Sequence, residues 1–399
     1  LQRAAAIETW SYRKLHETAL ARAAWLAGVG VKPGDRCAIY ADNDAAWCAT
    51  YLGILRAGAV AVPLDTNHSA KQVATIVRDA SPRVLFANAR VLPVAREALT
   101  TIPDTILADV HEFESAGSTN LPGFSRTLSD PAVILYTSGT TSDPKGVVLT
   151  NSNLIAERDA AFQIISVTEE DSVLGVLPLF HALAQLANLL LPTAVGARIL
   201  FLETVNSTEL VRALSEQRIT IFACVPQFFY LIHQRVLQQV ESRGSLGKFV
   251  FRTLLAISFR SRWLGLNLGP RLFGRVHAIM GRQMRLFVTG GSKFDPAVGR
   301  DFYALGFTIL QAYGLTETSG AATLTNPDEA HLDTVGRALP GQEIDVLPSD
   351  DPELDGEIAI RGPIVMQGYF GRPEATEAVM RDGWFLSGDL GRLDQQGRL

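Results

Sequence analysis

The amino-acid sequence predicts an α/β protein that contains two parallel-sheet subdomains and a small β-barrel-like subdomain. Short apolar runs alternate with stretches of helical periodicity over most of the chain, which favours parallel strands joined by helices. The 399 residues are enough for two or three domains, since single domains average about 150 residues. After Gly336 the apolar runs shorten and are separated by Asp, Pro and Gly, which favours antiparallel strands.

The predicted first subdomain covers residues 1–165. Ser11 stands before apolar residues at helical spacing, so it is expected to cap the first helix. Helices are predicted over 11–30, 44–57 and 69–80 and from Asn153 onward, and strands over 35–40, 59–63, 84–87, 132–135 and 147–149.

The predicted second subdomain covers residues 166–334, and the small β subdomain covers residues 335–399. No Asp, Glu, Lys or Arg occurs between Ser172 and Ala197, but proline, histidine and amide residues interrupt this stretch. It is therefore expected to form a core strand and a buried helix rather than a transmembrane helix. Strands are predicted over 172–177, 198–201, 219–223, 308–311, 343–347 and 356–361, and helices over 181–191 and 207–217.

Composition places the chain among globular proteins and narrows its partners. Hydrophobic residues make up 47% and charged residues 19%, which excludes a disordered chain. The net charge of −5 excludes nucleic acid as the general partner. Cys37, Cys48 and Cys224 form no CxxC pair, so free thiols in a reducing cytoplasm are expected. The sequence has no initiator Met and no signal peptide and starts and stops in mid-pattern, so a fragment is expected.

The stretch YTSGTTSDPKGVVLT, Tyr136–Thr150, has the composition of an anion-binding loop between two strands. Small residues let backbone N–H groups approach phosphate oxygens, hydroxyls donate hydrogen bonds, and Lys145 adds a positive charge. A Ser/Thr/Gly loop can also be a surface linker, but linkers rarely end in Pro-Lys-Gly between two apolar strands. The P-loop of NTPases is excluded, since it needs Gly-Lys-Ser/Thr opening a helix. The candidate phosphate ligands are Thr137, Ser138, Gly139, Thr140, Thr141 and Lys145.

Two further candidates follow predicted strands. In Ala312–Glu317 an aromatic ring and a glycine could place the ring against a base, and Glu317 could hold Mg²⁺. A Tyr beside Gly at a strand end is, however, usually structural. Val288–Ser292 is an apolar strand followed by paired glycines, which alone is only a turn signal.

Two more segments carry one candidate side chain each. His181 ends the segment Pro178–His181 near an apolar helix, where a lone His is more often a satisfied core residue. Ser387–Asp389 places a carboxylate in a tight turn, which suits a bidentate grip on vicinal ribose hydroxyls. An ordinary hairpin has the same Gly-Asp pattern.

In combination, these motifs resemble the adenylate-forming superfamily of acyl-CoA synthetases, luciferases and peptide-synthetase adenylation domains. The family's loop is close to YTSGTTGxPKGV, and PLFH, GGS, YGxTE and SGD follow here in the family's order. Ser142 stands where the family usually has Gly, which costs about 1 kcal/mol if that position needs a positive φ. The resemblance implies a layered αβαβα N-terminal domain. It also implies that the C-terminal domain with its catalytic Lys is absent, so the fragment is expected to hold ATP but to be weak or inactive.

The resemblance implies a role for each matching residue. Tyr313 lies against adenine, Asp389 holds the ribose, and Lys145 with the loop clamps the outer phosphates. Thr316 touches the α-phosphate, Glu317 binds Mg²⁺, and His181 positions the acyl group. The implied catalytic residues are Lys145, His181, Thr316 and Glu317, and the nucleotide is bordered by Gly290, Gly291, Ala312, Tyr313 and Gly314.

The implied reaction activates a fatty acid carboxylate with ATP to an acyl-adenylate and then forms a thioester with CoA, releasing AMP. The chain looks most like long-chain fatty acyl-CoA synthetases, because of its long basic insertion and of Arg361–Pro363 with Met366, Gly368, Tyr369 and Pro373. Two alternatives stay open: an acyl-AMP ligase that loads an acyl carrier protein, and a nucleotide- or lipid-binding module that has lost catalysis. Acyl chain length cannot be read from the sequence.

Residues 231–285 stand out by charge, with ten basic residues and one acidic residue, Glu241. Apolar residues are interleaved throughout this segment. A solvated helical insertion fits this pattern, and so does a basic amphipathic surface facing anionic lipid or a phosphorylated carrier. The second interpretation would make a cytoplasmic protein a peripheral membrane protein.

Overall fold

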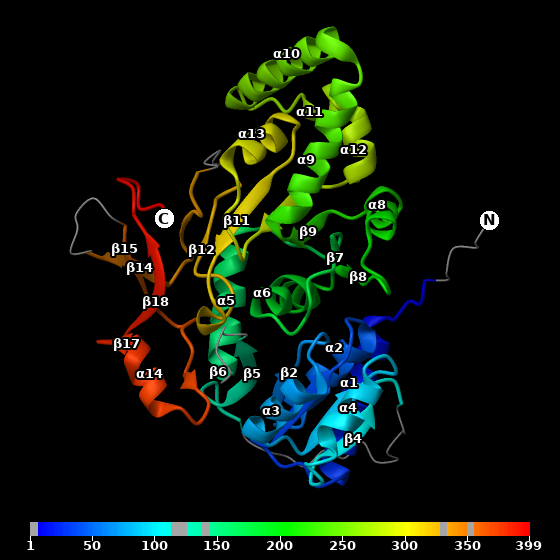
Figure 1. Cartoon of the computed structure of the whole chain (residues 1–399), viewed down its shortest axis with the longest axis vertical. Coiled ribbons are helices and arrows are strands. Elements are labelled where there is room, and N and C mark those ends of the chain that lie inside the picture. Colours follow the sequence, from blue (N-terminus) through cyan, green and yellow to red (C-terminus); the bar gives the residue numbers. More distant parts are fainter. Residues whose placement is uncertain (1–6, 113–125, 138–143, 328–332, 349–354) are drawn as a thin grey trace. The chain divides into compact units, whose positions relative to one another are not determined.

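A computed structural model of the chain describes residues 7–112, 126–137, 144–327, 333–348 and 355–399 (Figure 1). The chain divides into two compact units. Unit 1 consists of Leu1–Asn151 and Gln367–Arg372, and unit 2 consists of Ser152–Met366 and Pro373–Leu399. The three-part division predicted from the sequence stays a prediction.

A seven-stranded sheet forms the centre of unit 1, in the order β16-β6-β5-β2-β1-β3-β4. The strands from β5 to β4 run parallel, whereas β6 and β16 are antiparallel to their neighbours. The sheet is therefore mixed, where the sequence predicted parallel pairing. The connection from Thr137 to Lys145 is too short for a helical crossover, so β6 must return antiparallel. The strands are β1 (Arg36–Tyr40), β2 (Val60–Pro63), β3 (Val84–Ala87), β4 (Ile106–Asp109), β5 (Pro131–Thr137), β6 (Lys145–Thr150) and β16 (Gly368–Tyr369).

Helices cover both faces of this sheet, whose inner strands are buried throughout. One set of alternating side chains, including Tyr40 and Leu85, packs with α3 (Ala70–Ala80) and α4 (Leu92–Leu99). Phe86 belongs to the other set, and its ring centroid lies 5.7 Å from that of Trp25 in α1. Alternation along each strand thus separates two apolar layers. The helices on this second face are α1 (Tyr12–Gly28) and α2 (Ala45–Arg56), which pack against each other.

Side-chain caps determine where the helices of unit 1 begin. Ser11 accepts a hydrogen bond from the Lys14 N–H at 3.1 Å, as predicted, and Asp44 accepts one from the Trp47 N–H at 2.6 Å. Ser69 forms a capping box with Gln72. Each cap satisfies an N–H group that the first helical turn leaves without a partner. The predicted helices over 11–30, 44–57 and 69–80 are confirmed, with ends shifted by at most two residues.

Unit 2 contains a second seven-stranded sheet, in the order β13-β12-β11-β10-β9-β7-β8. The strands from β11 to β8 are parallel, and β12 and β13 add an antiparallel edge. The predicted α/β alternation is confirmed, again with a mixed rather than a purely parallel sheet. The strands are β7 (Ser172–Leu174), β8 (Arg198–Leu200), β9 (Ile221–Cys224), β10 (Leu286–Thr289), β11 (Ile309–Tyr313), β12 (Thr323–Leu324) and β13 (Arg337–Ala338).

The two faces of this sheet carry different cores. On one face, Val173, Ile221 and Val288 pack with α5 (Asn151–Ile164) and with the helical segment 182–195. On the other face, phenylalanines form an edge-to-face cluster, in which the ring centroids of Phe229 and Phe287 are 5.4 Å apart. The remaining helices are α8 (Ser207–Glu216), α9 (Pro226–Glu241), α10 (Gly244–Trp263), α11 (Gly269–Leu272), α12 (Gly274–Met280) and α13 (Pro296–Ala304).

The uncharged stretch between Ser172 and Ala197 forms a core strand and a mostly buried helix, as predicted. After β7 the chain forms α6 (Ala182–Gln185), a π-turn η1 (Leu186–Leu190) and α7 (Leu191–Val195). Asn188 is fully buried within this segment. Across the described residues, no helix combines the length and apolar character needed to cross a bilayer.

The last part of unit 2 is a four-stranded antiparallel sheet in the order β14-β15-β18-β17. Leu386 pairs with Ala359 and Leu390 with Glu357, so Ser387–Asp389 oppose Ile358 alone. Asp389 therefore lies in a β-bulge of a continuous strand, and the tight turn predicted there is wrong. The bulge needs a left-handed residue, which Gly388 supplies with φ of 73°. The elements are β14 (Glu343–Leu347), β15 (Gly356–Arg361), α14 (Pro373–Val379), β17 (Met380–Arg381) and β18 (Trp384–Gly391).

Glu157 of α5 is a carboxyl group buried completely inside unit 2, with 0% of its surface exposed. Its Oε1 accepts a hydrogen bond from the Ala321 N–H at 2.8 Å, while Oε2 has no partner among the described residues. Burial raises the pKa of Glu157 well above its ordinary value. Folding therefore favours the protonated side chain.

Glu157→Gln is expected to reduce the pH dependence of stability. A raised folded-state pKa means that the folded protein binds more protons than the unfolded chain above about pH 4.3, so wild-type stability falls as pH rises. The slope is up to about 1.4 kcal/mol per pH unit until the folded pKa is reached. Glutamine keeps an acceptor for Ala321 and does not titrate. Denaturant midpoints measured at about pH 5 and about pH 8 should therefore differ less in the variant.

The matched control is Glu97→Gln, which changes an exposed carboxylate of α4. This variant should keep the wild-type pH profile. If Glu157→Gln lost as much stability as the wild type between the two pH values, the buried carboxyl would have no titration linked to folding.

Candidate functional site

The predicted phosphate loop connects two paired strands of unit 1. β5 and β6 form an antiparallel ladder in which Tyr136 lies opposite Gly146 and Thr137 opposite Lys145. The predicted strands on both sides of the loop are therefore confirmed, and the ladder holds the loop at both ends. The loop residues proper lie outside the described residues, so their role stays a prediction: Ser138, Gly139, Thr140, Thr141, Ser142 and Asp143.

Lys145 is exposed at the start of β6, and its Nζ lies 5.0 Å from the ring centroid of Tyr369 in β16. This cation–π contact orients the ammonium group while leaving it at the surface. Beside it, the Phe370 N–H donates to the Gly146 carbonyl at 2.7 Å, which anchors β16 on β6. The hydroxyl of Tyr136 donates to Asp79 at 2.6 Å. The ammonium group of Lys145 therefore lies on a hydrogen-bonded strand that begins directly after the predicted loop.

Unit 2 brings Tyr313 and Asp389 together from two different sheets. Tyr313 ends β11, and its hydroxyl donates to Asp389 Oδ2 at 2.9 Å. Burial and the hydrogen bond to Asp389 raise the pKa of Tyr313, so the phenol remains a neutral donor. The Asp389 N–H donates to Ser387 Oγ at 3.1 Å, and that hydroxyl donates to the Ile358 carbonyl at 2.7 Å. An aromatic ring and an exposed carboxylate therefore stand side by side.

Gly290 and Gly291 follow β10, next to the end of β11. A Cβ on Gly290 would meet the Ala312 carbonyl oxygen at 2.8 Å, so this close approach requires glycine. The same Cβ would lie 3.4 Å from Leu183 in α6. The exposed His181 occupies the N-cap position of α6, and its ring centroid lies 4.4 Å from that of Phe180. The structure thus brings Gly290, Ala312 and the start of α6 together.

Residues 314–322 form the turn between β11 and β12, where Gly314 packs against the backbone of 320–322. Gly320 closes the turn against α6 and α5, since a Cβ there would meet the Leu183 N at 2.8 Å and Glu157 Oε1 at 3.0 Å. The short helix η2 (Thr316–Thr318) lies inside this turn. Thr316 is half-buried and Glu317 is 9% exposed, and the Glu317 carbonyl accepts from the Met366 N–H at 2.8 Å.

Sequence reasoning missed three residues that support this region. Glu157 holds the turn through Ala321, but it stands beside Arg158 and Asp159, so its helix position looks solvent-exposed in the sequence. Leu183 contacts Gly290, and no sequence signal distinguishes it from other core leucines. Ser387 is two residues from Asp389, and this closeness in sequence could have indicated its supporting role.

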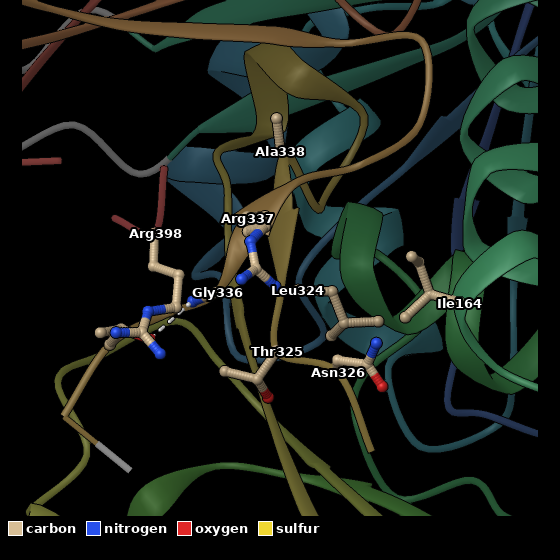
Figure 2. Close-up of a pocket in the computed structure, with 9 residues that line it drawn as sticks. Ile164, Leu324, Thr325, Asn326, Gly336, Arg337, Ala338 and Arg398 are labelled. Atoms are coloured by element: carbon tan, nitrogen blue, oxygen red, sulfur yellow. Dashed lines mark hydrogen bonds between the residues drawn. The ribbon is translucent and has the colours of Figure 1, made fainter. Parts of the chain in front are cut away.

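A small cavity also opens in unit 2, at the antiparallel edge of the sheet (Figure 2). Its volume is about 190 Å³, which is below the roughly 300–1,000 Å³ typical of ligand pockets. Arg337 and Arg398 line one side and Ile164 the other. Arg398 Nε donates to Asp394 Oδ2 at 2.6 Å, and the backbone and side chain of Arg398 lower the pKa of Asp394 to about 2. None of the site residues predicted from the sequence lines this cavity.

Comparison with known proteins places this geometry in context. The family model of the AMP-binding enzymes matches residues 2–370 of the chain. The long-chain-fatty-acid–CoA ligase FadD15 of Mycobacterium bovis is 29% identical over 408 residues, which cover 95% of this chain and 66% of that protein. The chain therefore spans slightly less than two thirds of this curated relative's length.

Two solved structures share the fold and about a quarter of the sequence. The inhibitor-bound N-terminal domain of FACL13 from Mycobacterium tuberculosis has a TM-score of 0.79 and 26% identity, covering 97% of this chain and 90% of that domain. ATP-bound MatB from Rhodopseudomonas palustris has a TM-score of 0.78 and 26% identity, covering 97% of this chain and 72% of that protein.

These findings confirm the fold class predicted from the motifs. The two mixed sheets with their helices and the small antiparallel sheet are those of the N-terminal domain of adenylate-forming enzymes. The family match reaches into both units and includes the β5–β6 hairpin, in which Lys145 begins β6, and the strand that ends at Tyr313. Asp389 lies beyond the matched residues. The chain belongs to the family of AMP-binding enzymes.

Proposed function

We propose that this chain takes part in the ATP-dependent activation of a fatty acid carboxylate to an acyl-adenylate, which CoA then converts to a thioester. The observation that carries the proposal is the Tyr313–Asp389 pair, in a chain that resembles a fatty acid–CoA ligase over 95% of its length. The carboxylate attacks the α-phosphate of ATP and pyrophosphate leaves. No general base is needed, because the attacking carboxylate is already ionised.

The nucleoside would be held by groups of unit 2. The Tyr313 ring offers a flat apolar face to adenine, beside the backbone of Gly290, Ala312 and Gly314. Asp389 would accept hydrogen bonds from the ribose hydroxyls. A carboxylate has about four acceptor positions, and the Tyr313 hydroxyl uses one of them, so acceptors remain for both hydroxyls.

The reacting groups would be handled by charge and by donors. Attack of one anion on another requires positive charge and hydrogen-bond donors at the phosphates. Lys145 and the residues 137–141 would supply these at the outer phosphates, and Thr316 at the α-phosphate. Gly291 would border the acyl carboxylate, and His181 would position the acyl group at the start of α6.

Glu317 would contribute the protein's carboxylate to Mg²⁺. In the part of the chain that the structure describes, no cluster of three or more acidic, His or Cys side chains could hold a metal alone. Mg²⁺ commonly takes one or two carboxylates and completes its shell with phosphate oxygens and water. A single Glu therefore fits an ion that arrives with the nucleotide and neutralises phosphate charge.

CoA is the acceptor we propose, for a fatty acid of medium to long chain, because the relative named above is a fatty acid–CoA ligase. A carrier protein as acceptor and a module that binds nucleotide without catalysis are the competing functions. The decisive experiment is fatty-acid-dependent exchange of labelled pyrophosphate into ATP by the whole gene product that contains these residues. Exchange with C8 to C18 acids supports the proposal, and a choice between CoA and holo-carrier protein identifies the acceptor. If ATP binds but no acid supports exchange, the competing function, a module that binds nucleotide without catalysis, would be favoured.

Asp389→Asn is expected to weaken ATP binding by about 10- to 100-fold, since a hydrogen bond to a charged group contributes about 1.5–3 kcal/mol. The loss should be specific for ribose. Wild-type protein should bind ATP more tightly than 2′,3′-dideoxy-ATP, and the variant should lose that preference, as measured by calorimetry with both nucleotides.

The control for this experiment is Asp345→Asn, which neutralises an exposed carboxylate on β14 of the same small sheet. It should leave both affinities unchanged. If the Asp389→Asn variant still discriminated between the two nucleotides, the ribose would have to bind elsewhere.

Lys145→Ala is expected to weaken ATP binding while leaving adenosine binding unchanged, because the ammonium group is proposed to contact only phosphates. Loss of one charge-assisted contact should cost about tenfold or more in the affinity for ATP. Lys145 is exposed and contributes only a surface cation–π contact, so the thermal midpoint should change little.

Lys71→Ala, on the exposed side of α3, is the matched control for charge. Equal affinity of wild type and Lys145→Ala for ATP would remove the loop from the site. A parallel loss of adenosine affinity would instead indicate damage to the fold.

A further inference from the structure

α10 is the longest helix of the basic segment 231–285, and one of its faces packs against the rest of unit 2. It contacts α9, α11 and α13 and lies on their outer side (Figure 1). Its partly buried residues Phe251, Leu254 and Leu255 join the phenylalanine core of unit 2. Ser258 and Ser261 are buried where the helix lies against its neighbours. The helix is therefore held lengthwise along the surface of unit 2.

The opposite face of α10 exposes large apolar side chains. Leu246 is 73% exposed, Phe249 70% and Trp263 79%. Leu264, which caps the helix, is 78% exposed. Residues three, four and seven apart share one face of a helix, so these side chains form a stripe along one side of α10, with the exposed Thr253 and Arg260 among them. We call this stripe the α10 outer face, which consists of Leu246, Phe249, Val250, Ile257, Trp263 and Leu264.

Such a stripe is unusual for a surface that remains in water. A solvated insertion would place polar side chains outward and leave large apolar groups exposed only singly. Contiguous exposed apolar surface instead marks a site of interaction. The apolar face thus favours an interaction surface over the solvated-insertion interpretation for α10.

Basic side chains flank the α10 outer face. Arg252 and Arg260 are exposed on the same side of the helix, and Arg243 precedes it. No ion pair within the described residues involves Arg252 or Arg260. The flanking charge extends over the neighbouring segments through further exposed arginines: Arg235, Arg271, Arg275 and Arg282.

Three of the ten basic residues in this segment have structural partners instead. Lys248 pairs with Glu241 at 2.9 Å, and Arg285 pairs with Asp171 at 2.6 Å. Arg262 donates to the carbonyls of Tyr303 and Phe307 at 3.1 and 3.0 Å, respectively. These three side chains are engaged within unit 2, and Arg252 and Arg260 are the basic residues that α10 itself presents beside its outer face.

We propose that the α10 outer face binds the surface of an anionic lipid bilayer. An interfacial helix lies in the membrane plane with its apolar side chains at the headgroup–acyl boundary and basic residues among the phosphates. The α10 outer face has both parts. Packing against α9 and α13 keeps the helix parallel to such a surface, and it leaves the stripe free to enter.

Charge complementarity selects the bilayer over other occupants. A second copy of this face would bring Arg252 and Arg260 against the same arginines, which disfavours self-association. The phosphate of a phosphorylated carrier would pair with the arginines, but it offers no apolar surface to Phe249 and Trp263. An anionic bilayer satisfies the arginines and the apolar side chains together.

The test is co-sedimentation of the full chain with large vesicles of phosphatidylcholine, with and without about 30% phosphatidylglycerol. Binding is expected to the anionic vesicles and is expected to weaken as NaCl is raised from about 0.05 to about 0.5 M. Brominated acyl chains should quench Trp263 fluorescence in the bound protein. Trp263→Phe, which keeps an apolar side chain, should bind similarly and lose this quenching.

Two double variants separate charge from apolar contact. Arg252→Gln with Arg260→Gln should lower the partition coefficient by about 30-fold, from about 1 kcal/mol per charge. Phe249→Ala with Trp263→Ala should lower it at least about tenfold. All four side chains are exposed, so the thermal midpoint should stay unchanged.

Matched controls change the same residue types away from α10. Arg83→Gln with Arg96→Gln removes two exposed charges of unit 1, and Leu128→Ala with Val205→Ala truncates two side chains that are each 61% exposed. Both controls should bind vesicles like the wild type. Absent or salt-independent binding would overturn the proposal. A dimer that forms without vesicles, and that the double variant Phe249→Ala with Trp263→Ala dissociates, would also overturn it. The α10 outer face would then bind a second copy of the chain.

Discussion

Parallel strands buried on both faces are the constraint on which this structure depends. The backbone groups of such strands hydrogen-bond to neighbouring strands, and their side chains pack against helices on both faces. Polar groups of these strands therefore gather at the strand ends. In unit 2, β10 and β11 are parallel neighbours, and Gly290 lies close to Ala312 for that reason. The predicted groups Gly290, Gly291, Tyr313, Thr316 and Glu317 follow from where β10 and β11 end, whereas Asp389 comes from a bulge within β18.

The strand ends need support, and unit 2 supplies it from inside the fold. Glu157 holds the turn after β11 through the Ala321 N–H, at the cost of burying a carboxyl group. The bulge at Gly388 turns Asp389 out of a regular strand and toward Tyr313. The bulge interrupts regular strand pairing, and burial of Glu157 costs desolvation free energy. Such local costs are common where a protein positions functional groups.

The α10 helix at the surface of unit 2 is not explained by the strand ends, because it carries apolar side chains on both of its sides. One side completes the core, and the other meets solvent beside exposed arginines. A bilayer contact and an acyl substrate are chemically consistent, since long-chain fatty acids partition into membranes. The two proposals nevertheless depend on different residues, so either can hold without the other.

The sequence by itself determined many of the helices and strands, the cap at Ser11, the order of the motifs and the family, because these depend on periodicity and on short-range hydrogen bonds. It did not predict the helices between Pro226 and Ala304 or the short antiparallel strands. The tertiary structure alone decided that the sheets are mixed, that Asp389 lies in a bulge and that Glu157 is buried. It also sorted the arginines of 231–285 into structural and exposed groups. Strand direction, register and the burial of a charge depend on which distant segments pack together, and local patterns carry no record of that.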